Sequence, residues 1–131
     1  MTQSRRLPRP TEAELEILAV LWRRGPSTVR EVFEALPKGR ASGYTTVLKF
    51  MQIMTAKGLV KRKESQRAHV YQASVSREQT QRQLLTHLAE RAFGGSALQL
   101  AQQALASAKQ ASPEDLAELR KMLDEFERSQ S

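Results

Sequence analysis

The stretch SGYTTVLKFMQIMTAK, residues 42–57, sets the pattern from which the rest of the sequence can be interpreted. Four apolar side chains recur at i, i+3, i+4 and i+7, which is the spacing that lines one face of an α-helix: Val47, Phe50, Met51 and Met54. Ser42 is suited to the N-cap, because its hydroxyl can accept a hydrogen bond from a free amide of the first turn. Gly58 is suited to the left-handed position that ends a helix.

The opposite face of this helix bears a cation, an amide, hydroxyls and no acid. Its residues are Tyr44, Thr45, Leu48, Lys49 and Gln52. A helix that packs on one side and offers hydrogen-bond donors on the other is typical of a nucleic-acid reader. The alternative is an ordinary solvated face that lacks Asp and Glu.

Two further helices are predicted before this one. Thr11 and Thr28 each precede a glutamate by three residues, which is the capping-box spacing at a helix start. Gly25 ends the first helix, and Pro37 ends the second, since a residue before proline avoids the helical region. Trp22 lies on the apolar face of the first helix and is expected in the core.

After Gly58 the pattern changes to that of a β-hairpin, with strands at residues 59–63 and 68–72 and a loop at residues 64–67. Cations crowd it: Lys61, Arg62, Lys63 and Arg67. Three helices followed by a basic hairpin form a winged helix-turn-helix. In that fold the third helix enters the major groove, and the wing places its cations beside the phosphates.

The C-terminal part is predicted to form amphipathic helices that begin near Ser76, Ser96 and Ser112, with a break at Gly94 and Gly95. A small winged domain cannot cover their apolar stripes, so we expect a second copy of the chain to do so. An intramolecular helical hairpin is the alternative. The expected dimerisation residues are Leu84, Leu88, Phe93, Leu98, Leu105, Leu116, Leu119, Leu123 and Phe126.

Charge separates the two parts of the chain. The net charge is +7, but residues 1–75 hold 14 Lys and Arg against 6 Asp and Glu, whereas the remainder holds 7 against 8. A basic domain attracts polyanions, which favours nucleic acid as partner. The longest apolar run, residues 17–22, is too short to cross a bilayer, so no membrane insertion is expected. The absence of cysteine is compatible with a reducing cytoplasm.

No pattern of an enzyme or a cofactor site emerges. His69 and His87 lie in different elements without an acid or cysteine at ligand spacing, so no metal site is expected. There is no Ser-His-Asp arrangement and no Gly-rich phosphate loop. We therefore expect no catalytic residue, no cofactor and no enzymatic activity.

Candidate DNA contacts follow from the chemistry of base edges and phosphates. Lysine can donate to guanine O6 and N7, threonine can offer a hydroxyl or touch a thymine methyl, and glutamine can read adenine. The expected base-reading residues of the third helix are Tyr44, Thr45, Thr46, Lys49 and Gln52. The expected phosphate-binding residues are Arg40, Ser42, Arg62, Lys63 and Arg67.

Six segments together resemble the penicillinase-repressor family of BlaI/MecI type: TEAELEILAVLW, GPSTVREVFEAL, YTTVLKFMQIMTAKGLV, RAHVY, AFGGS and SPEDLAELRKMLDE. The resemblance runs from about Pro10 to Glu127. It implies a bacterial repressor with an N-terminal winged helix-turn-helix and a C-terminal helical dimerisation region. Such dimers bind inverted repeats in promoters and block transcription. Proteolysis within the dimerisation helices, downstream of a membrane metallopeptidase sensor, usually relieves repression in this family.

Two departures from the family are visible. Its best-studied members are cut at an Asn-Phe bond after the Gly-Gly break, where this chain reads SALQLAQQALAS. The cysteine cluster of a copper-responsive branch is also missing.

The predicted organisation is a flexible basic arm at residues 1–10, a winged domain at 11–75 and a helical dimerisation region at 76–131. The expected function is a cytoplasmic, homodimeric repressor of pseudo-palindromic operators in double-stranded DNA. A small-molecule-responsive winged-helix regulator and a winged-helix protein-interaction adaptor are the alternatives.

Overall fold

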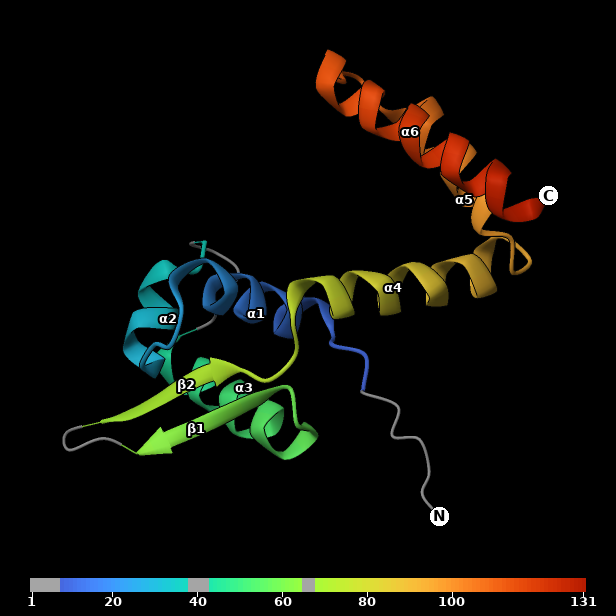
Figure 1. Ribbon diagram of the computed structural model, residues 1–131. Helices are drawn as coiled ribbons and strands as arrows, with labels where there is room; N and C mark the ends of the chain where they lie inside the picture. Colours follow the sequence, from blue (N-terminus) through green and yellow to red (C-terminus); the bar gives the residue numbers. More distant parts are fainter. Residues whose placement is uncertain (1–7, 38–42, 65–67) are drawn as a thin grey trace. The chain divides into compact units, whose positions relative to one another are not determined.

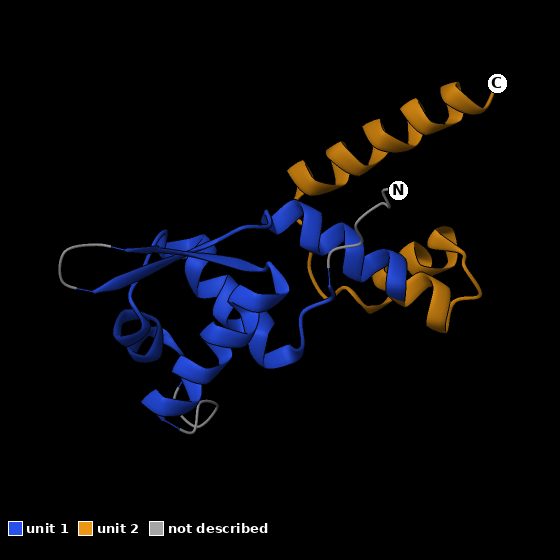
Figure 2. Cartoon of the chain, turned by 90° about the horizontal axis from the view of Figure 1, so that it is seen from below, with its two compact units in different colours: residues 1–87 blue, residues 88–131 orange. Residues whose placement is uncertain are grey.

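The computed structural model describes residues 8–37, 43–64 and 68–131 (Figure 1). The fold is mainly helical with one small hairpin, as predicted. In chain order the elements are α1 (Glu12–Arg24), α2 (Val29–Ala35), α3 (Tyr44–Lys57), β1 (Val60–Glu64), β2 (His69–Ala73), α4 (Arg77–Ala92), α5 (Ala97–Ser107) and α6 (Pro113–Gln130). Each strand begins one residue later than predicted. The chain divides into two compact units, residues 1–87 and 88–131 (Figure 2).

α1 and α2 each begin with a reciprocal capping box, as their sequences predict. The Thr11 hydroxyl accepts from the Glu14 amide at 3.2 Å, and the Thr11 amide donates to Glu14 Oε1 at 2.9 Å. Thr28 and Glu31 make the same two bonds at 3.1 and 2.9 Å. Each box satisfies two amides that the first turn would otherwise leave unpaired.

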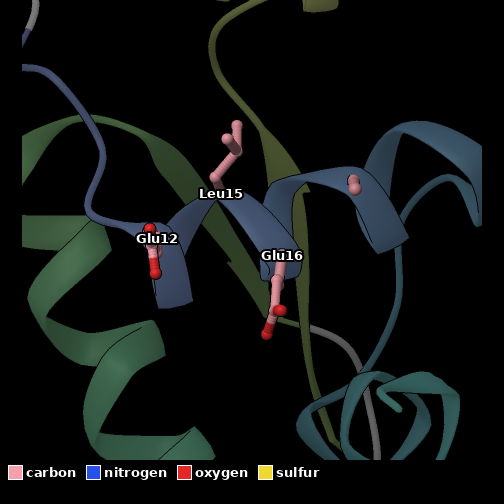
Figure 3. A pocket seen from close by; sticks show the side chains of 4 residues that line it. Glu12, Leu15 and Glu16 are labelled. Carbon is pink, nitrogen blue, oxygen red and sulfur yellow. The ribbon is translucent and has the colours of Figure 1, made fainter. Parts of the chain in front are cut away.

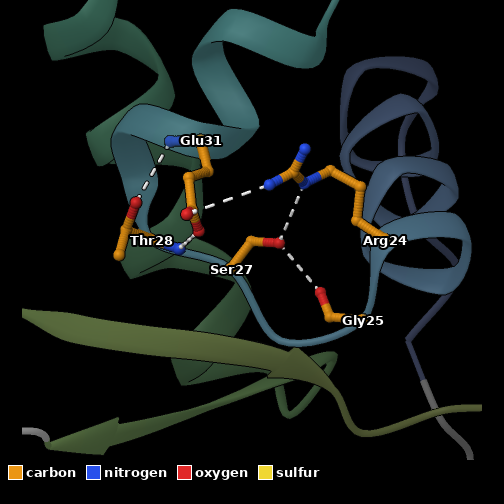
Figure 4. Close-up of polar contacts among 5 residues, drawn as sticks. All are labelled: Arg24, Gly25, Ser27, Thr28 and Glu31. Carbon is orange, nitrogen blue, oxygen red and sulfur yellow. Dashed lines mark hydrogen bonds and ion pairs between the residues drawn. The ribbon is translucent and has the colours of Figure 1, made fainter.

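A tight polar turn joins α1 to α2 (Figure 4). Gly25 ends α1 with a positive φ of 88°. The buried Ser27 donates its hydroxyl proton to the Gly25 carbonyl at 2.9 Å, and Arg24 Nε donates to Ser27 Oγ at 3.5 Å. Arg24 also lies 3.8 Å from the Glu31 carboxylate. This network links the C-terminal end of α1 to the start of α2.

The start of α3 differs from the prediction, whereas its end does not. Gly43 occupies the N-cap in an extended conformation, without a side-chain cap, so the assignment of Ser42 to the N-cap was wrong. Ser42 itself lies outside the described residues. Gly58 ends the helix in the left-handed conformation, with φ 84° and ψ 12°, and its amide donates to the Met54 and Thr55 carbonyls.

The hairpin is tied to the helices through one backbone bridge. β1 and β2 pair antiparallel, with Arg62 opposite Tyr71. Ser27, from the α1–α2 turn, exchanges two backbone hydrogen bonds of 2.9 and 2.8 Å with Tyr71. A two-stranded hairpin is marginal by itself, so this third segment and the burial of the Tyr71 ring stabilise its base.

The core of the first unit holds α3 by one face. Val47, Met51 and Met54 are buried and Phe50 is partly buried, which confirms the predicted stripe. α3 packs against α2 and β1, and α1 packs against α2 and β2. Leu48, assigned to the outward face from the sequence, packs partly against this core instead, because its position on the helix borders the buried stripe.

Trp22, expected in the core, lies at its edge. Its ring packs partly against the core, and its Nε1 donates to the Val75 carbonyl at 3.0 Å. Arg77, in the first turn of α4, lies with Cζ 5.7 Å from the centroid of the indole. The start of α4 is therefore attached to α1.

The helices that follow begin where the sequence predicts, and α4 ends at the predicted break. Ser76, Ser96 and Ser112 each accept an amide of the first turn at 2.9–3.0 Å. Gly94 and Gly95, with φ of 58° and 87°, end α4 and separate it from α5. Among the described helices, none combines the length and apolar character needed to cross a membrane.

Candidate nucleic-acid interface

The outward face of α3 is the centre of the candidate site. Thr45, Lys49 and Gln52 are exposed, and Thr46 is half-buried at the margin of the core. Because Val47, Met51 and Met54 anchor the other side of the same helix, the outward residues are carried by a rigid element. An ammonium, an amide and hydroxyls on one such face can bond to base edges in a major groove.

Two apolar residues on this face were missed by sequence reasoning. Ile53 is exposed, and so is Ala56. Ile53 follows Lys49 by four residues and Ala56 follows Gln52 by four, so each lies one turn below a polar residue of the site. This i+4 spacing from Lys49 and Gln52 could have identified both residues as members of the outward face from the sequence. An exposed methyl group in this place is suited to contact with a thymine methyl.

Tyr44, the first residue of α3, contacts two side chains of α2. The Phe33 and Tyr44 rings meet edge to face, with centroids 6.2 Å apart and an interplanar angle of 82°. Arg30 Cζ lies 4.8 Å from the Tyr44 ring centroid. The Tyr44 side chain remains 38% exposed. α2 therefore orients the aromatic residue at the N-terminal end of the candidate reading helix.

The cations of the hairpin divide between its two faces, because successive residues of a strand point to opposite sides. Arg62 lies opposite the buried Tyr71, and its guanidinium is 3.9 Å from the Glu64 carboxylate. Lys61 and Lys63 share the other face. The predicted phosphate ligands Arg62 and Lys63 are both exposed but point to different sides, and Lys61, absent from that prediction, shares the face of Lys63. Arg40 and Arg67 lie outside the described residues.

The second cation of α3 is neutralised within the domain. Lys57 Nζ lies 2.9 Å from both carboxylate oxygens of Glu14, which is 2% exposed. Burial raises the pKa of Glu14, but hydrogen bonds from Lys57 and Thr11 and the charge of Lys57 outweigh it, so the pKa falls below 4.5. Lys49 thus remains as the outward cation of the helix.

A shallow depression of about 330 Å³ lies on α1, lined by Glu12, Leu15, Glu16 and Ala19 (Figure 3). All four residues come from one helix, and the depression is open to solvent. Its two carboxylates repel polyanions, so it is no part of a DNA-binding surface. It also lies away from α5 and α6 in sequence, where the small-molecule alternative would require a pocket.

Most of the predicted dimerisation residues are exposed. Leu84 and Phe93 are partly buried, whereas the others are exposed: Leu88, Leu98, Leu105, Leu116, Leu119, Leu123 and Phe126. Within residues 88–131, the buried side chains are those of Ala89 and Leu100. α6 buries none of its residues. The sequence analysis missed two further exposed members, Leu85 and Met122.

Comparison with known proteins places these features in context. The model of the penicillinase repressor family matches residues 10–125. The transcriptional regulators BlaI of two Mycobacterium tuberculosis strains are each 40% identical over 67 residues, which is 50% of this chain and 49% of the relative. The chain therefore spans about half the length of these curated relatives in the match.

Two solved structures are also similar. The DNA-binding domain of the repressor BlaI is 23% identical, with a TM-score of 0.49, and the match covers 56% of this chain and 90% of that chain. The Bacillus licheniformis BlaI monomeric form in complex with the blaP half-operator has the same identity and TM-score, with 56% and 89% covered.

Proposed function

The chain belongs to the penicillinase repressor family of transcriptional regulators, and we propose that it acts as a homodimeric, sequence-specific repressor of transcription. The family consists of regulators rather than enzymes, in agreement with the sequence analysis. In the proposed mechanism, two copies occupy an inverted-repeat operator and occlude the promoter. The protein would act in the cytoplasm, where its operator DNA lies.

The observation that carries this proposal is the outward face of α3. Thr45, Lys49 and Gln52 project from a helix whose opposite side is anchored in the core, beside a hairpin that presents Lys61 and Lys63. The proposed roles follow from chemistry. The α3 residues read base edges, with Lys49 donating to guanine, and the hairpin cations bind phosphates.

Dimerisation is supported by the apolar surface of α5 and α6. An intramolecular hairpin would bury part of the α6 stripe, yet α6 has no buried residue. Leu116, Leu119, Leu123 and Phe126 recur at alternating spacings of three and four, which suits pairing with another helix. Contiguous exposed apolar surface of this kind marks a protein interface, and a second copy of the chain is its proposed partner.

Two copies explain both affinity and regulation. When the α3 of one copy is bound, the dimer contacts hold the α3 of the second copy at a high effective concentration near the other half-site. A signal that separates the copies would remove this gain and release the promoter. We propose that proteolysis or another signal acts on the dimerisation helices, within a membrane metallopeptidase pathway. If the signal is proteolysis, the cleaved bond is not an Asn-Phe bond, because the stretch after Gly95 has none.

Selection from a randomised duplex library, followed by footprinting on the promoter of the chain's own gene, tests the proposal. The expected result is an enriched pseudo-palindrome whose half-sites lie about 10 bp apart, or a multiple of that distance, centre to centre. Failure to enrich any sequence would reject sequence-specific repression. Enrichment of a single half-site by a monomeric protein would reject the dimeric mechanism alone.

A further inference from the structure

Arg30 is not among the residues assigned above to DNA contacts, and it lies against the ring of Tyr44, a residue expected from the sequence to read bases. Arg30 lies in the first turn of α2, is exposed, and holds its guanidinium 4.8 Å from the Tyr44 ring centroid. Phe33, one turn later on α2, meets the same ring edge to face. Phe33 thus holds the Tyr44 ring in place, and the ring in turn supports the Arg30 guanidinium.

The ring constrains the guanidinium without occupying its donors. A distance of 4.8 Å is within the range in which an aromatic face attracts a cation. The attraction to the ring acts through the positive charge of the guanidinium, so the N–H groups stay available to a further ligand. The ring also restricts a long side chain before any ligand arrives, which lowers the entropy that binding would cost.

In the part of the domain that the structure describes, no side chain is hydrogen-bonded to the Arg30 guanidinium or ion-paired with it. Among residues 8–37, 43–64 and 68–131, no carboxylate forms an ion pair with Arg30. Arg24 differs, since it lies 3.8 Å from Glu31 and hydrogen-bonds to Ser27. An arginine that is oriented but has no acidic partner is suited to an external anion, and its planar fork matches a phosphate.

The location of Arg30 and Tyr44 indicates which external anion Arg30 would bind. Tyr44 is the first residue of α3, so the Arg30 guanidinium lies at the N-terminal end of the proposed reading helix. In helix-turn-helix complexes the N-terminal residues of the reading helix approach base edges, while the preceding helix crosses the sugar-phosphate backbone. Arg30, on that preceding helix, lies where the backbone passes.

We propose, on the basis of the DNA-binding function above, that Arg30 binds a phosphate of the strand bordering the major groove and that the Tyr44 ring is its support. The contact contributes affinity and register rather than sequence information. The Tyr44 ring orients Arg30, and its hydroxyl is not required for that task.

The test is a salt titration of the full chain on a mixed-sequence duplex, followed by fluorescence anisotropy. This probe needs no operator, because phosphate contacts also support non-specific binding. Arg30→Ala should weaken binding about ten-fold at the lowest salt concentration, the order expected for a charge-assisted hydrogen bond. It should also lower the slope of log affinity against log salt by about 0.9 per bound chain. Arg82→Ala, which removes an exposed arginine from α4, is the matched control and should leave the slope unchanged.

A double-mutant cycle tests the role of the ring. Tyr44→Leu should reduce the effect of Arg30→Ala several-fold, whereas Tyr44→Phe should preserve it, because only the former removes the aromatic face. Arg30→Lys should retain most of the salt slope, but the DNA affinity of this variant should no longer depend on the Tyr44 ring. Circular dichroism verifies the fold of each variant, and Arg30→Gln replaces Arg30→Ala in the titration if that variant unfolds.

The outcomes separate this inference from the function on which it rests. Failure of the wild-type protein to bind duplex DNA at low salt would overturn both the role of Arg30 and the proposed DNA-binding function. Wild-type binding with equal salt slopes for Arg30→Ala and Arg82→Ala would overturn only the role of Arg30. An Arg30 effect that is the same with and without the Tyr44 ring would overturn the support role.

Discussion

The ammonium of Lys57 lies 2.9 Å from both carboxylate oxygens of Glu14, although 43 residues separate the two in sequence. Glu14 is in the first turn of α1 and Lys57 is the last residue of α3. The pair therefore joins the start of the first helix to the end of the helix proposed to read DNA. Glu14 is buried, whereas 32% of the Lys57 side chain is exposed.

Lys57→Met should destabilise the winged domain by about 2 kcal/mol. Breaking a fully buried ion pair costs about 3–5 kcal/mol because one charge is left uncompensated, and partial exposure of Lys57 lowers that cost. Urea unfolding followed by circular dichroism measures the change. Lys49→Met, in the same helix but with an exposed side chain, should be nearly neutral; equal losses in both variants would contradict the role of the pair.

The same pair should make stability sensitive to acid. The folded-state pKa of Glu14 lies below 4.5, its ordinary value, so the unfolded state binds the proton more readily. The stabilisation is present above about pH 4.5 and is lost as the pH falls through the folded-state pKa. Melting temperatures between pH 7 and pH 3 should fall more steeply for wild type than for Glu14→Gln. Parallel curves would show that Glu14 does not contribute.

Lys49→Ala should relax sequence discrimination. A lysine bonded to guanine O6 and N7 contributes about 1–3 kcal/mol against the wrong base, so the variant should lose preference at one position of each half-site. Competition between the selected operator and single-base variants measures this preference. A uniform loss of affinity for all sequences would instead assign Lys49 to a phosphate.

The two faces of the hairpin should contribute unequally to DNA affinity. Lys63→Ala removes a cation that pairs with no carboxylate of the described residues, from the face shared with Lys61, whereas Arg62→Ala removes one that already pairs with Glu64. Lys63→Ala should therefore lower the salt slope by about one unit and Arg62→Ala by less. Salt titrations of both variants give the comparison, and a larger effect of Arg62→Ala would place the DNA on the other face.

Leu123→Glu should separate the two copies. A carboxylate within the α6 stripe would be buried without a partner at the proposed interface, which is costly. Sedimentation at several protein concentrations should show a monomer that retains its helical circular dichroism. Lys121→Glu, a charge change at an exposed polar position of the same helix, should remain dimeric. Unchanged assembly of Leu123→Glu would move the interface away from α6.

Much of the local structure followed from the sequence, because its causes lie within a few residues. Thr11 and Thr28 cap helices through glutamates three positions ahead, and Gly58 adopts the left-handed conformation that most residues avoid. The apolar stripe of α3 was predicted for the same reason. The start of α3 was missed by one residue, since serine and glycine are both favourable at an N-cap and Gly43 occupies it.

Periodicity and capping chemistry therefore predicted the elements, their order and the exposed polar residues of α3, namely Thr45, Lys49 and Gln52. Tertiary packing brings together groups that are distant in the sequence: Lys57 with Glu14, Ser27 with Tyr71, and Arg30 with Tyr44. Packing also places Leu48 partly against the core, and strand register places Arg62 and Lys63 on opposite sides of the hairpin. These contacts depend on how helices pack and on strand register, and no local pattern encodes either, because each is set by elements far apart in the chain.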